Sequence, residues 1–337
     1  MSNVERFGVF LPSFIWQGDG PERASGIKDF SRQVEDLGFE SIFITDHLFA
    51  AQQFYSVNFL EPISALSLVA GVTERVKIGT SVMVLPIREP VLLAKQLATL
   101  HFLSTGRVIL GAGIGWYPPE YAATGVKKSE RGARTDEILD IIMPLLEGES
   151  VTYDGEFYKI KDVEIEPILD TRPEVWIGGG SQLADPGSPD LPRFVDAVKR
   201  RILKSEGWIP RPTCPPEDIA RDWAELQPYL RENGRDPSSL TVAHENFLHL
   251  ALTNDREKAL KEQHEAMLKV MSNARGPEYL EKVYLFGTPD EVVESLQARI
   301  DAGVQRFMLH TMTPDPGQLE HWVTEMIEHV RFPDDSD

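Results

Sequence analysis

The chain contains a single cysteine, Cys214, so it cannot form an internal disulfide bond, and no spacing of cysteine and histidine resembles a zinc site. It contains no run close to the ~18 apolar residues that a membrane-spanning helix needs. Its first residues, MSNVERFGVFLPSF, lack the basic segment and apolar stretch of a signal peptide. We therefore expect a protein of the reducing cytoplasm that is neither exported nor anchored to a membrane.

Positively charged side chains are scarce in this sequence. It has 34 Lys and Arg residues against 53 Asp and Glu residues, which gives a formal net charge of −19. Only Lys199, Arg200 and Arg201 form a local basic cluster. Phosphate backbones and anionic lipids repel such a protein, so nucleic acid and membranes are disfavoured as partners. We expect the substrate to be a small molecule.

Strand-like and helix-like patterns alternate along the chain, which is typical of βα units and a parallel sheet. Apolar residues make up 42% of the 337 residues, enough for a large core. Helical spacing of apolar residues predicts helices at 27–39, 62–73, 91–103 and 134–147. The segments with a strand pattern are 6–11, 41–45, 76–85, 107–113, 174–178, 206–210, 240–252 and 305–311.

Eight strands separated by helices favour an α/β fold of the (β/α)₈ TIM barrel type, for which about 250 residues is typical. We expect one domain over residues 1–337, with insertions near 114–133, 149–172, 181–193 and 255–285. Within the second insertion, VTYDGEFYKI predicts a hairpin that turns at Asp154 and Gly155. A doubly wound open sheet is the alternative, but no G-x-G-x-x-G motif opens the first helix.

A barrel of this type carries its site where the strands end at their C-termini. One such end is ITDHLF, where Asp46 and His47 follow an apolar strand. A histidine at that place can move a proton at neutral pH, and a neighbouring carboxylate can orient it. A loop histidine that caps a helix or faces water is the alternative. Two more strand ends with titratable residues are His244-Glu245 and His310-Thr311.

A second group of candidates is rich in glycine. In WIGGGSQ, the residues Gly178, Gly179, Gly180 and Ser181 directly follow a strand, and exposed N–H groups with a hydroxyl can cradle a phosphate. A plain flexible turn is equally compatible. Two further sets are Gly113 with Trp116, which could make room for and wall a flat ring, and Arg131 with Arg134, which could reach an anion.

These pieces, in this order, resemble the bacterial luciferase-like monooxygenase superfamily. The matching stretches include FGVFLPSF, GFESIFITDH, VKIGTSVMVLPIREP, EVWIGGGS and FGTPDEVVESLQARIDAGVQRFMLH, and they span nearly the whole chain. The resemblance implies a (β/α)₈ barrel that binds FMN or a deazaflavin at the C-terminal ends of its strands. It also implies a bulge at the end of the third strand, often with a non-prolyl cis peptide bond, beneath the central ring of the cofactor.

Carried onto this sequence, the bulge falls at Ser81 and Val82, followed by Met83. His47 aligns with a histidine that contacts the flavin or acts as acid or base in several relatives, with Asp46 beside it. The loop from Gly179 to Ser181 aligns with the loop that holds the cofactor phosphate, and an arginine near Arg131 or Arg134 also contacts phosphate in some relatives. This chain departs from many relatives in the Pro- and Asp-rich piece QLADPGSPDLPRF that follows the loop.

The resemblance implies two enzymatic functions. The first is a monooxygenase that uses O₂ and reduced FMN, supplied by a separate flavin reductase because the chain has no dinucleotide fingerprint. The alternative is a deazaflavin-dependent dehydrogenase or reductase that transfers hydride without oxygen. A non-enzymatic flavin-storing subunit is a third possibility, and His47 argues against it. The resemblance also implies a homodimer, because members of the superfamily commonly dimerise. Aromatic residues in the loops, such as Phe54, Tyr55 and Tyr279, suggest an apolar ligand.

Overall fold

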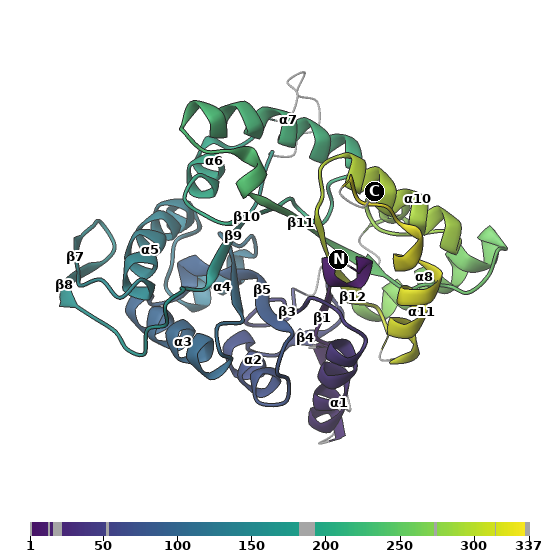
Figure 1. Ribbon diagram of the computed structural model, residues 1–337, viewed down its shortest axis with the longest axis horizontal. Coiled ribbons are helices and arrows are strands. Elements are labelled where there is room, and N and C mark those ends of the chain that lie inside the picture. Colours follow the sequence, from purple (N-terminus) through teal and green to yellow (C-terminus); the bar gives the residue numbers. More distant parts are fainter. Residues whose placement is uncertain are drawn as a thin grey trace.

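Eight parallel strands close into a barrel, in the order β1-β12-β11-β10-β9-β6-β5-β3. The computed structural model describes residues 2–12, 14–15, 22–51, 54–181, 193–272, 275–313 and 315–333. Figure 1 shows the strands at the centre of the molecule, with helices arranged around them. The predicted (β/α)₈ barrel is confirmed.

The barrel strands are β1 (Phe7–Phe10), β3 (Ser41–Ile44), β5 (Lys77–Val84), β6 (Val108–Gly113), β9 (Glu174–Gly178), β10 (Gly207–Ile209), β11 (Thr241–Leu248) and β12 (Arg306–Thr311). Two antiparallel pairs lie outside the barrel, β2 (Phe14–Ile15) with β4 (Asn58–Phe59) and β7 (Val151–Asp154) with β8 (Lys159–Val163). The helices are α1 (Glu22–Asp36), α2 (Pro62–Ala70), α3 (Pro90–Leu103), α4 (Pro118–Ala123), α5 (Arg131–Leu146), α6 (Asp196–Ile202), α7 (Pro216–Glu232), α8 (Arg256–Val270), α9 (Pro277–Val283), α10 (Pro289–Asp301) and α11 (Gly317–Glu325).

Several helices start at a proline that follows a side chain able to cap the helix. Glu61 accepts a bond from the N–H of Ser64 at the start of α2, and Glu89 caps α3 in the same way. Thr288 begins α10 with a full capping box. Proline has no N–H to leave unpaired in the first turn, and the cap satisfies another free donor. These local signals fix where the three helices begin.

The predicted insertions contain structure of their own. The segment 114–133 holds α4, the segment 255–285 holds α8 and α9, and 149–172 forms the predicted hairpin of β7 and β8. Figure 1 shows this hairpin projecting from the body of the barrel. Most of the insertion at 181–193 lies outside the described residues.

One predicted strand is too long. The segment 240–252 forms a strand only as far as Leu248. Beyond that point, the main chain of Leu250 bonds to a side chain instead of a neighbouring strand: its N–H donates to Gln318 Oε1 at 2.8 Å, and its carbonyl accepts from Gln318 Nε2 at 3.2 Å. An apolar run alone could not reveal that a side chain replaces the neighbouring strand as the hydrogen-bond partner.

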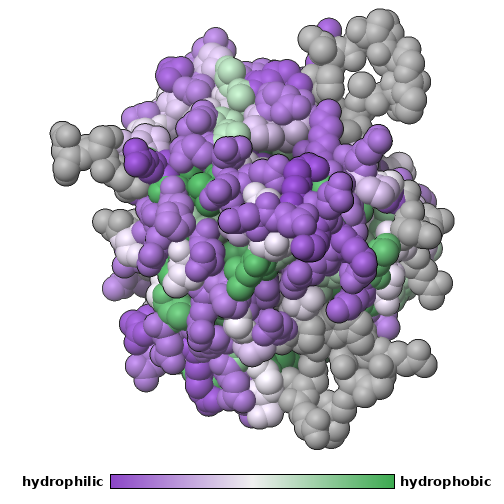
Figure 2. Space-filling model, turned by 90° about the vertical axis from the view of Figure 1, so that its right-hand side faces the viewer, coloured by the Kyte–Doolittle hydropathy of each residue, from purple (hydrophilic) through white to green (hydrophobic). Residues whose placement is uncertain are grey.

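Apolar side chains fill the barrel interior, and a larger apolar layer packs between the strands and the helices. The interior cluster consists of Phe10, Phe43, Ile109, Trp176, Ile209, Ala243 and Met308, with Val82 packed against it. The face in Figure 2, which carries α8, α10 and α11, is mostly hydrophilic with small apolar patches. Within the described residues, no helix is long and apolar enough to cross a membrane.

His244 lies on β11 with no exposed surface, between Ala243 and Glu245, which face the barrel interior. Burial lowers the pKa of His244 to about 3, the Arg299 guanidinium adds to this shift, and the backbone of Arg211 opposes it. The folded protein therefore holds His244 neutral at pH values where the unfolded chain would protonate it.

Replacing His244 by Leu is expected to flatten the acid dependence of stability. Below pH 6.5 the unfolded chain binds a proton that the folded protein does not, so the wild type loses about 1.4 kcal/mol of unfolding free energy per pH unit as pH falls towards 3. The variant lacks this loss. Urea unfolding at several pH values measures both slopes. Removing the exposed His329 is the matched control, and equal slopes for wild type and the His244 variant would contradict the prediction.

Candidate active site

The end of β5 is irregular where the resemblance places a bulge. Thr80 pairs with Leu110 of β6, but the next pair joins Met83 to Ala112, so the register shifts between Thr80 and Met83. The peptide bond between Ser81 and Val82 is cis. The predicted bulge and cis peptide bond are both confirmed.

Val82 occupies the space left by two glycines of the neighbouring strands. A Cβ added to Gly113 would lie 2.4 Å from one Val82 methyl carbon, and a Cβ added to Gly178 would lie 2.9 Å from the other. We expected Gly113 to make room directly for a flat ring. Instead, both glycines make room for Val82, whose half-buried side chain lies over the ends of β6 and β9.

Three buried polar residues from different strands form a chain of hydrogen bonds at this bulge. Ser81 Oγ donates to Glu245 Oε2 at 2.7 Å, and Glu245 Oε1 contacts His310 Nε2 at 2.9 Å. The His310 ring lies between Phe10 and Phe247, with ring centroids 3.4 and 4.2 Å away. Burial lowers the pKa of His310, which favours a neutral ring that donates to the carboxylate. Sequence reasoning noted both strand ends but did not connect them to Ser81.

His47 contacts a carboxylate that the sequence analysis missed. Its Nδ1 lies 3.0 Å from Oε1 of Glu120, and the same oxygen accepts the N–H of Leu48 at 2.8 Å. The Glu120 side chain is 1% exposed and lies in the first turn of α4. The only available signal was an acidic residue in a helix that follows a barrel strand directly. Glu120 therefore takes the orienting role that we predicted for Asp46.

Asp46 has different partners. Its Oδ1 accepts from Arg88 Nη2 at 2.7 Å, and its Oδ2 accepts from the N–H of Val84 at 2.9 Å. Burial raises the pKa of the Asp46 carboxyl, and the Arg88 guanidinium works against that shift. Asp46 thus ties the end of β3 to the end of β5.

The short loop before α4 fixes the position of Glu120. Tyr121 Oη donates to the carbonyl of Ile114 at 2.6 Å. Gly115 has φ +70°, and a Cβ there would lie 2.6 Å from Tyr121 Oη, so the close approach requires glycine. Burial raises the pKa of Tyr121 to about 12, which keeps the hydroxyl a donor at neutral pH.

Aromatic rings surround the imidazole of His47. The centroids of Tyr55, Phe59 and Trp116 lie 5.7, 4.9 and 5.6 Å from the His47 centroid. Trp116 is 42% exposed and forms the outer edge of this group. We call Tyr55, Phe59 and Trp116 the aromatic wall.

The glycine-rich loop after β9 is already paired within the protein. Ser181 donates through its N–H and its Oγ to the carboxylate of Asp222 at 2.9 and 2.5 Å, and that side chain is 1% exposed. The N–H of Gly179 donates to the carbonyl of Ile209, and a Cβ on Gly180 would lie 2.8 Å from Asp222 Oδ2. The predicted phosphate contact stays a prediction, and at Ser181 it requires the exchange of Asp222 for the phosphate.

Arg131 and Arg134 lie in the first turn of α5. Arg131 donates to the carbonyl of Lys128, and Arg134 bonds to Glu130 at 3.1 Å with its guanidinium 4.5 Å from the Phe157 ring centroid. The structure thus brings Arg134 to the hairpin side of the helix. The predicted role of the two arginines in phosphate binding is untested by these contacts.

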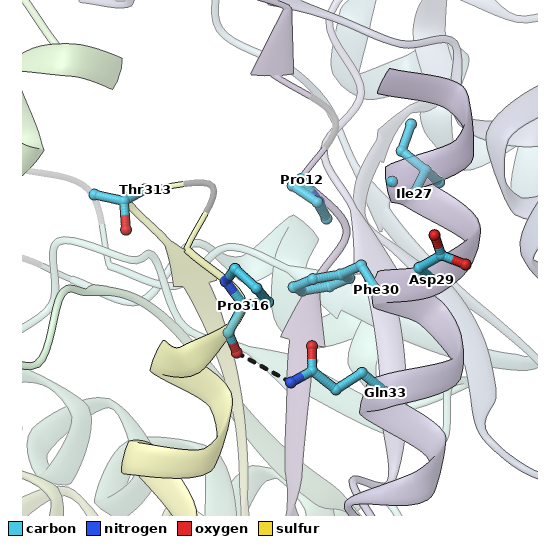
Figure 3. Close-up of a pocket in the computed structure, with 8 residues that line it drawn as sticks. Pro12, Ile27, Asp29, Phe30, Gln33, Thr313 and Pro316 are labelled. Carbon is cyan, nitrogen blue, oxygen red and sulfur yellow. Dashed lines mark hydrogen bonds between the residues drawn. The ribbon is translucent and has the colours of Figure 1, made fainter. Parts of the chain in front are cut away.

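A separate cavity of about 280 Å³ lies between α1 and the segment that joins β12 to α11 (Figure 3). Gln33 Nε2 bridges the two sides by donating to the carbonyl of Pro316 at 3.1 Å. The lining residues are Pro12, Gly26, Ile27, Asp29, Phe30, Gln33, Thr313 and Pro316, and none is a predicted site residue.

Comparison with known proteins gives relatives of two kinds. An uncharacterized protein of Mycobacterium tuberculosis is 30% identical over 177 residues, which span 52% of this chain and 56% of the relative. An F420-dependent glucose-6-phosphate dehydrogenase of Kineococcus radiotolerans is 27% identical over 302 residues and 87% of each chain. This chain therefore spans little more than half of the mycobacterial relative and most of the dehydrogenase.

Solved structures share the fold. Monooxygenase RslO1 from Streptomyces bottropensis matches with a TM-score of 0.79 and 18% identity, over 96% of this chain and 99% of the other. An F420-dependent secondary alcohol dehydrogenase in complex with an F420-acetone adduct matches with a TM-score of 0.75 and 18% identity, over 97% and 98%. These likenesses show the architecture alone.

The family model for luciferase-like monooxygenases matches residues 5–306, which covers most of the chain and every strand of the barrel up to the start of β12. Both the sequence relatives and the confirmed bulge at Ser81 and Val82 agree with that match. The chain therefore belongs to the luciferase-like monooxygenase family of oxidoreductases.

Proposed function

We propose that this oxidoreductase is a dehydrogenase that depends on the deazaflavin F420 and oxidises an alcohol carbon. The observation that carries the proposal is the buried pair of His47 and Glu120, with Nδ1 and Oε1 at 3.0 Å. A dehydrogenase must remove a proton from the substrate hydroxyl as hydride leaves the carbon. A histidine held by a carboxylate is suited to that task.

The contact with Glu120 defines the chemistry of each imidazole nitrogen. When Nδ1–H donates to the carboxylate, Nε2 carries the lone pair of the neutral ring. Nε2 can then accept the hydroxyl proton, and Glu120 stabilises the cation that forms. The aromatic wall limits the access of water to this ring.

The end of β5 fits a flat tricyclic ring. Val82 offers a half-buried apolar surface, and Ser81 and Glu245 supply polar atoms beside it. These three residues would hold the ring. When bound, a deazaflavin supplies a carbon that accepts the hydride from the substrate. The fit is weaker for the phosphate tail, because Ser181 is already paired with Asp222.

One relative favours F420 as the cofactor: the Kineococcus protein is an F420-dependent glucose-6-phosphate dehydrogenase. Its alignment covers 87% of each chain, so it supports the cofactor class more directly than the fold does. Glucose 6-phosphate is accordingly one of the alcohols to test first.

A flavin monooxygenase is the second candidate, because the aromatic wall suits its chemistry as well. Three rings packed around His47 would exclude water from the place where O₂ would react with the cofactor. In that case reduced FMN would come from a separate flavin reductase. A homodimer remains our proposal under either function.

Binding and oxygen uptake separate the two candidates. The purified chain is titrated with F420 and with FMN, oxidised and reduced, and cofactor fluorescence reports binding. We expect F420 to bind more tightly, and its oxidised absorbance to disappear with an alcohol substrate while an electrode records no O₂ uptake. Consumption of O₂ with reduced FMN, without binding of F420, would reject the dehydrogenase and support the monooxygenase.

A further inference from the structure

A half-buried arginine, Arg275, lies near the candidate active site without a carboxylate partner among the described residues. Its guanidinium carbon is 5.4 Å from the ring centroid of Phe54 and 5.0 Å from that of Tyr279. Within the part of the chain that the structure describes, its one hydrogen bond, from Nη1 to Tyr284 Oη, is long at 3.4 Å. We call Arg275, Phe54, Tyr279 and Tyr284 the arginine corner.

Other arginines of this acidic chain are better paired. Arg88, Arg172 and Arg201 each bond to a carboxylate at 2.8 Å or less. Arg107 has no carboxylate partner among the residues that the structure describes, and it donates instead to several main-chain carbonyls at 2.7 to 3.2 Å. Arg275 differs from these four arginines, because the single hydrogen bond that it makes to a described residue is long.

The aromatic contacts hold Arg275 in a particular way. Rings attract the guanidinium through its face, and this leaves the N–H groups along its edges available. A guanidinium has five such donors, and two parallel ones match the oxygens of a carboxylate or a phosphate. The corner therefore presents a cation that uses one of its five donors on a described residue.

The arginine corner is continuous with the aromatic wall around His47. The Phe54 centroid lies 5.2 Å from that of Trp116, and Tyr55 lies in the wall itself. The main chain joins the two regions: Ser56 N–H donates to the carbonyl of Val270, and Ser272 N–H donates to the carbonyl of Phe54. Arg275, Phe54 and Trp116 therefore form a continuous series of side chains that ends at His47.

We infer that Arg275 binds an oxyanion group of the substrate, a carboxylate or a phosphate, and so positions the reacting carbon near His47. This deepens the proposed function, because it names the class of substrate for the same site and rests on that function for its catalytic meaning. It also revises the expectation of an apolar ligand: Phe54 and Tyr279 contact the arginine with their rings.

Direct binding of anions to the full chain tests the inference without any cofactor. Calorimetric titrations use inorganic phosphate and acetate as probes, at an ionic strength held constant with NaCl. We expect one of the two to bind the wild type, which identifies phosphate or carboxylate as the group, and Arg275→Gln to weaken it at least about tenfold. Arg275→Lys should be intermediate, because it keeps the charge but not the paired donors.

Arg75→Gln is the matched control, because it removes the same charge from an exposed position. We expect it to change the affinity less than about twofold. Thermal unfolding checks that each variant folds, and Arg275→Lys carries the test if the Gln variant does not. Absence of binding by either probe, or equal affinity in wild type and the Arg275 variant, would overturn the inference.

A second measurement separates this inference from the proposed function. Hydride transfer to F420 is compared for a neutral alcohol and for an alcohol that bears a carboxylate or phosphate. If Arg275→Gln lowers kcat/KM only for the charged substrate, the result supports both the inference about Arg275 and the proposed dehydrogenase function. Equal rates for both substrates in both proteins would reject the inference and keep the dehydrogenase. Anion binding at Arg275 without any hydride transfer would keep the inference about anion binding and reject the dehydrogenase.

Discussion

Replacing His47 by Ala is expected to lower turnover by about 10² to 10⁴-fold while cofactor affinity changes by less than about threefold. The reason is that the imidazole is the proposed proton acceptor, whereas the cofactor ring would rest mainly on Val82. Steady-state kinetics and a cofactor titration on the same preparation measure both quantities.

Variants of Glu120 test how the histidine is held. Glu120→Gln keeps an oxygen for the His47 and Leu48 donors but loses the charge that stabilises the imidazolium, so we expect turnover to fall by about ten- to a hundredfold. Glu120→Ala also leaves the Leu48 N–H without its acceptor and should lose more. A His47 variant with wild-type turnover would remove the pair from the mechanism.

Replacing Asp46 by Ala is expected to destabilise the fold by about 3 to 5 kcal/mol. The Asp46 side chain is 1% exposed and its Arg88 partner 16% exposed, so the change leaves a poorly hydrated guanidinium and an unpaired N–H at Val84. Asp46→Asn keeps an oxygen for the Val84 N–H and should lose less. Urea unfolding followed by tryptophan fluorescence measures the differences.

Glu61 provides the matched control for Asp46. It also pairs with Arg88, at 3.3 Å, but its side chain is 43% exposed, so Glu61→Gln should cost less than about 1 kcal/mol. Because Asp46 ties two strand ends together, we expect the folded Asn variant to keep most of its turnover. A stable Asn variant that had lost its turnover would instead assign Asp46 a direct part in the reaction.

The barrel was predictable because its signals are local. Each signal depends on only a few neighbouring residues. Examples are the apolar runs at Ile42 and Val175, the prolines at helix starts, and Gly38, which has a positive φ. Where a tertiary contact replaced the local pattern, the prediction was wrong, as at Leu250, whose main chain bonds to Gln318. Strand ends are thus less predictable than strands.

The residues of the candidate site also fall into two groups, those that could be predicted from the sequence and those that could not. His47 was a candidate from its place at a strand end, and the bulge at Ser81 was implied by the family resemblance alone. Glu120 could not be predicted from the sequence, because it lies 73 positions from His47 and only the folding of α4 against the loop after β3 brings the two together. Ser181 and Asp222 are 41 positions apart, and no local pattern announces that a carboxylate satisfies the glycine-rich loop.

The sequence by itself determined the class of this molecule: an acidic, single-cysteine chain of alternating strands and helices, with titratable and glycine residues at the strand ends. Those properties depend on the order and kind of nearby residues. Only the tertiary structure decided which carboxylate holds His47, which side chain the glycines of β6 and β9 accommodate, and which aromatic rings Arg275 lies against. Such pairings depend on distances between segments far apart in the chain, and those distances exist only once the barrel has closed.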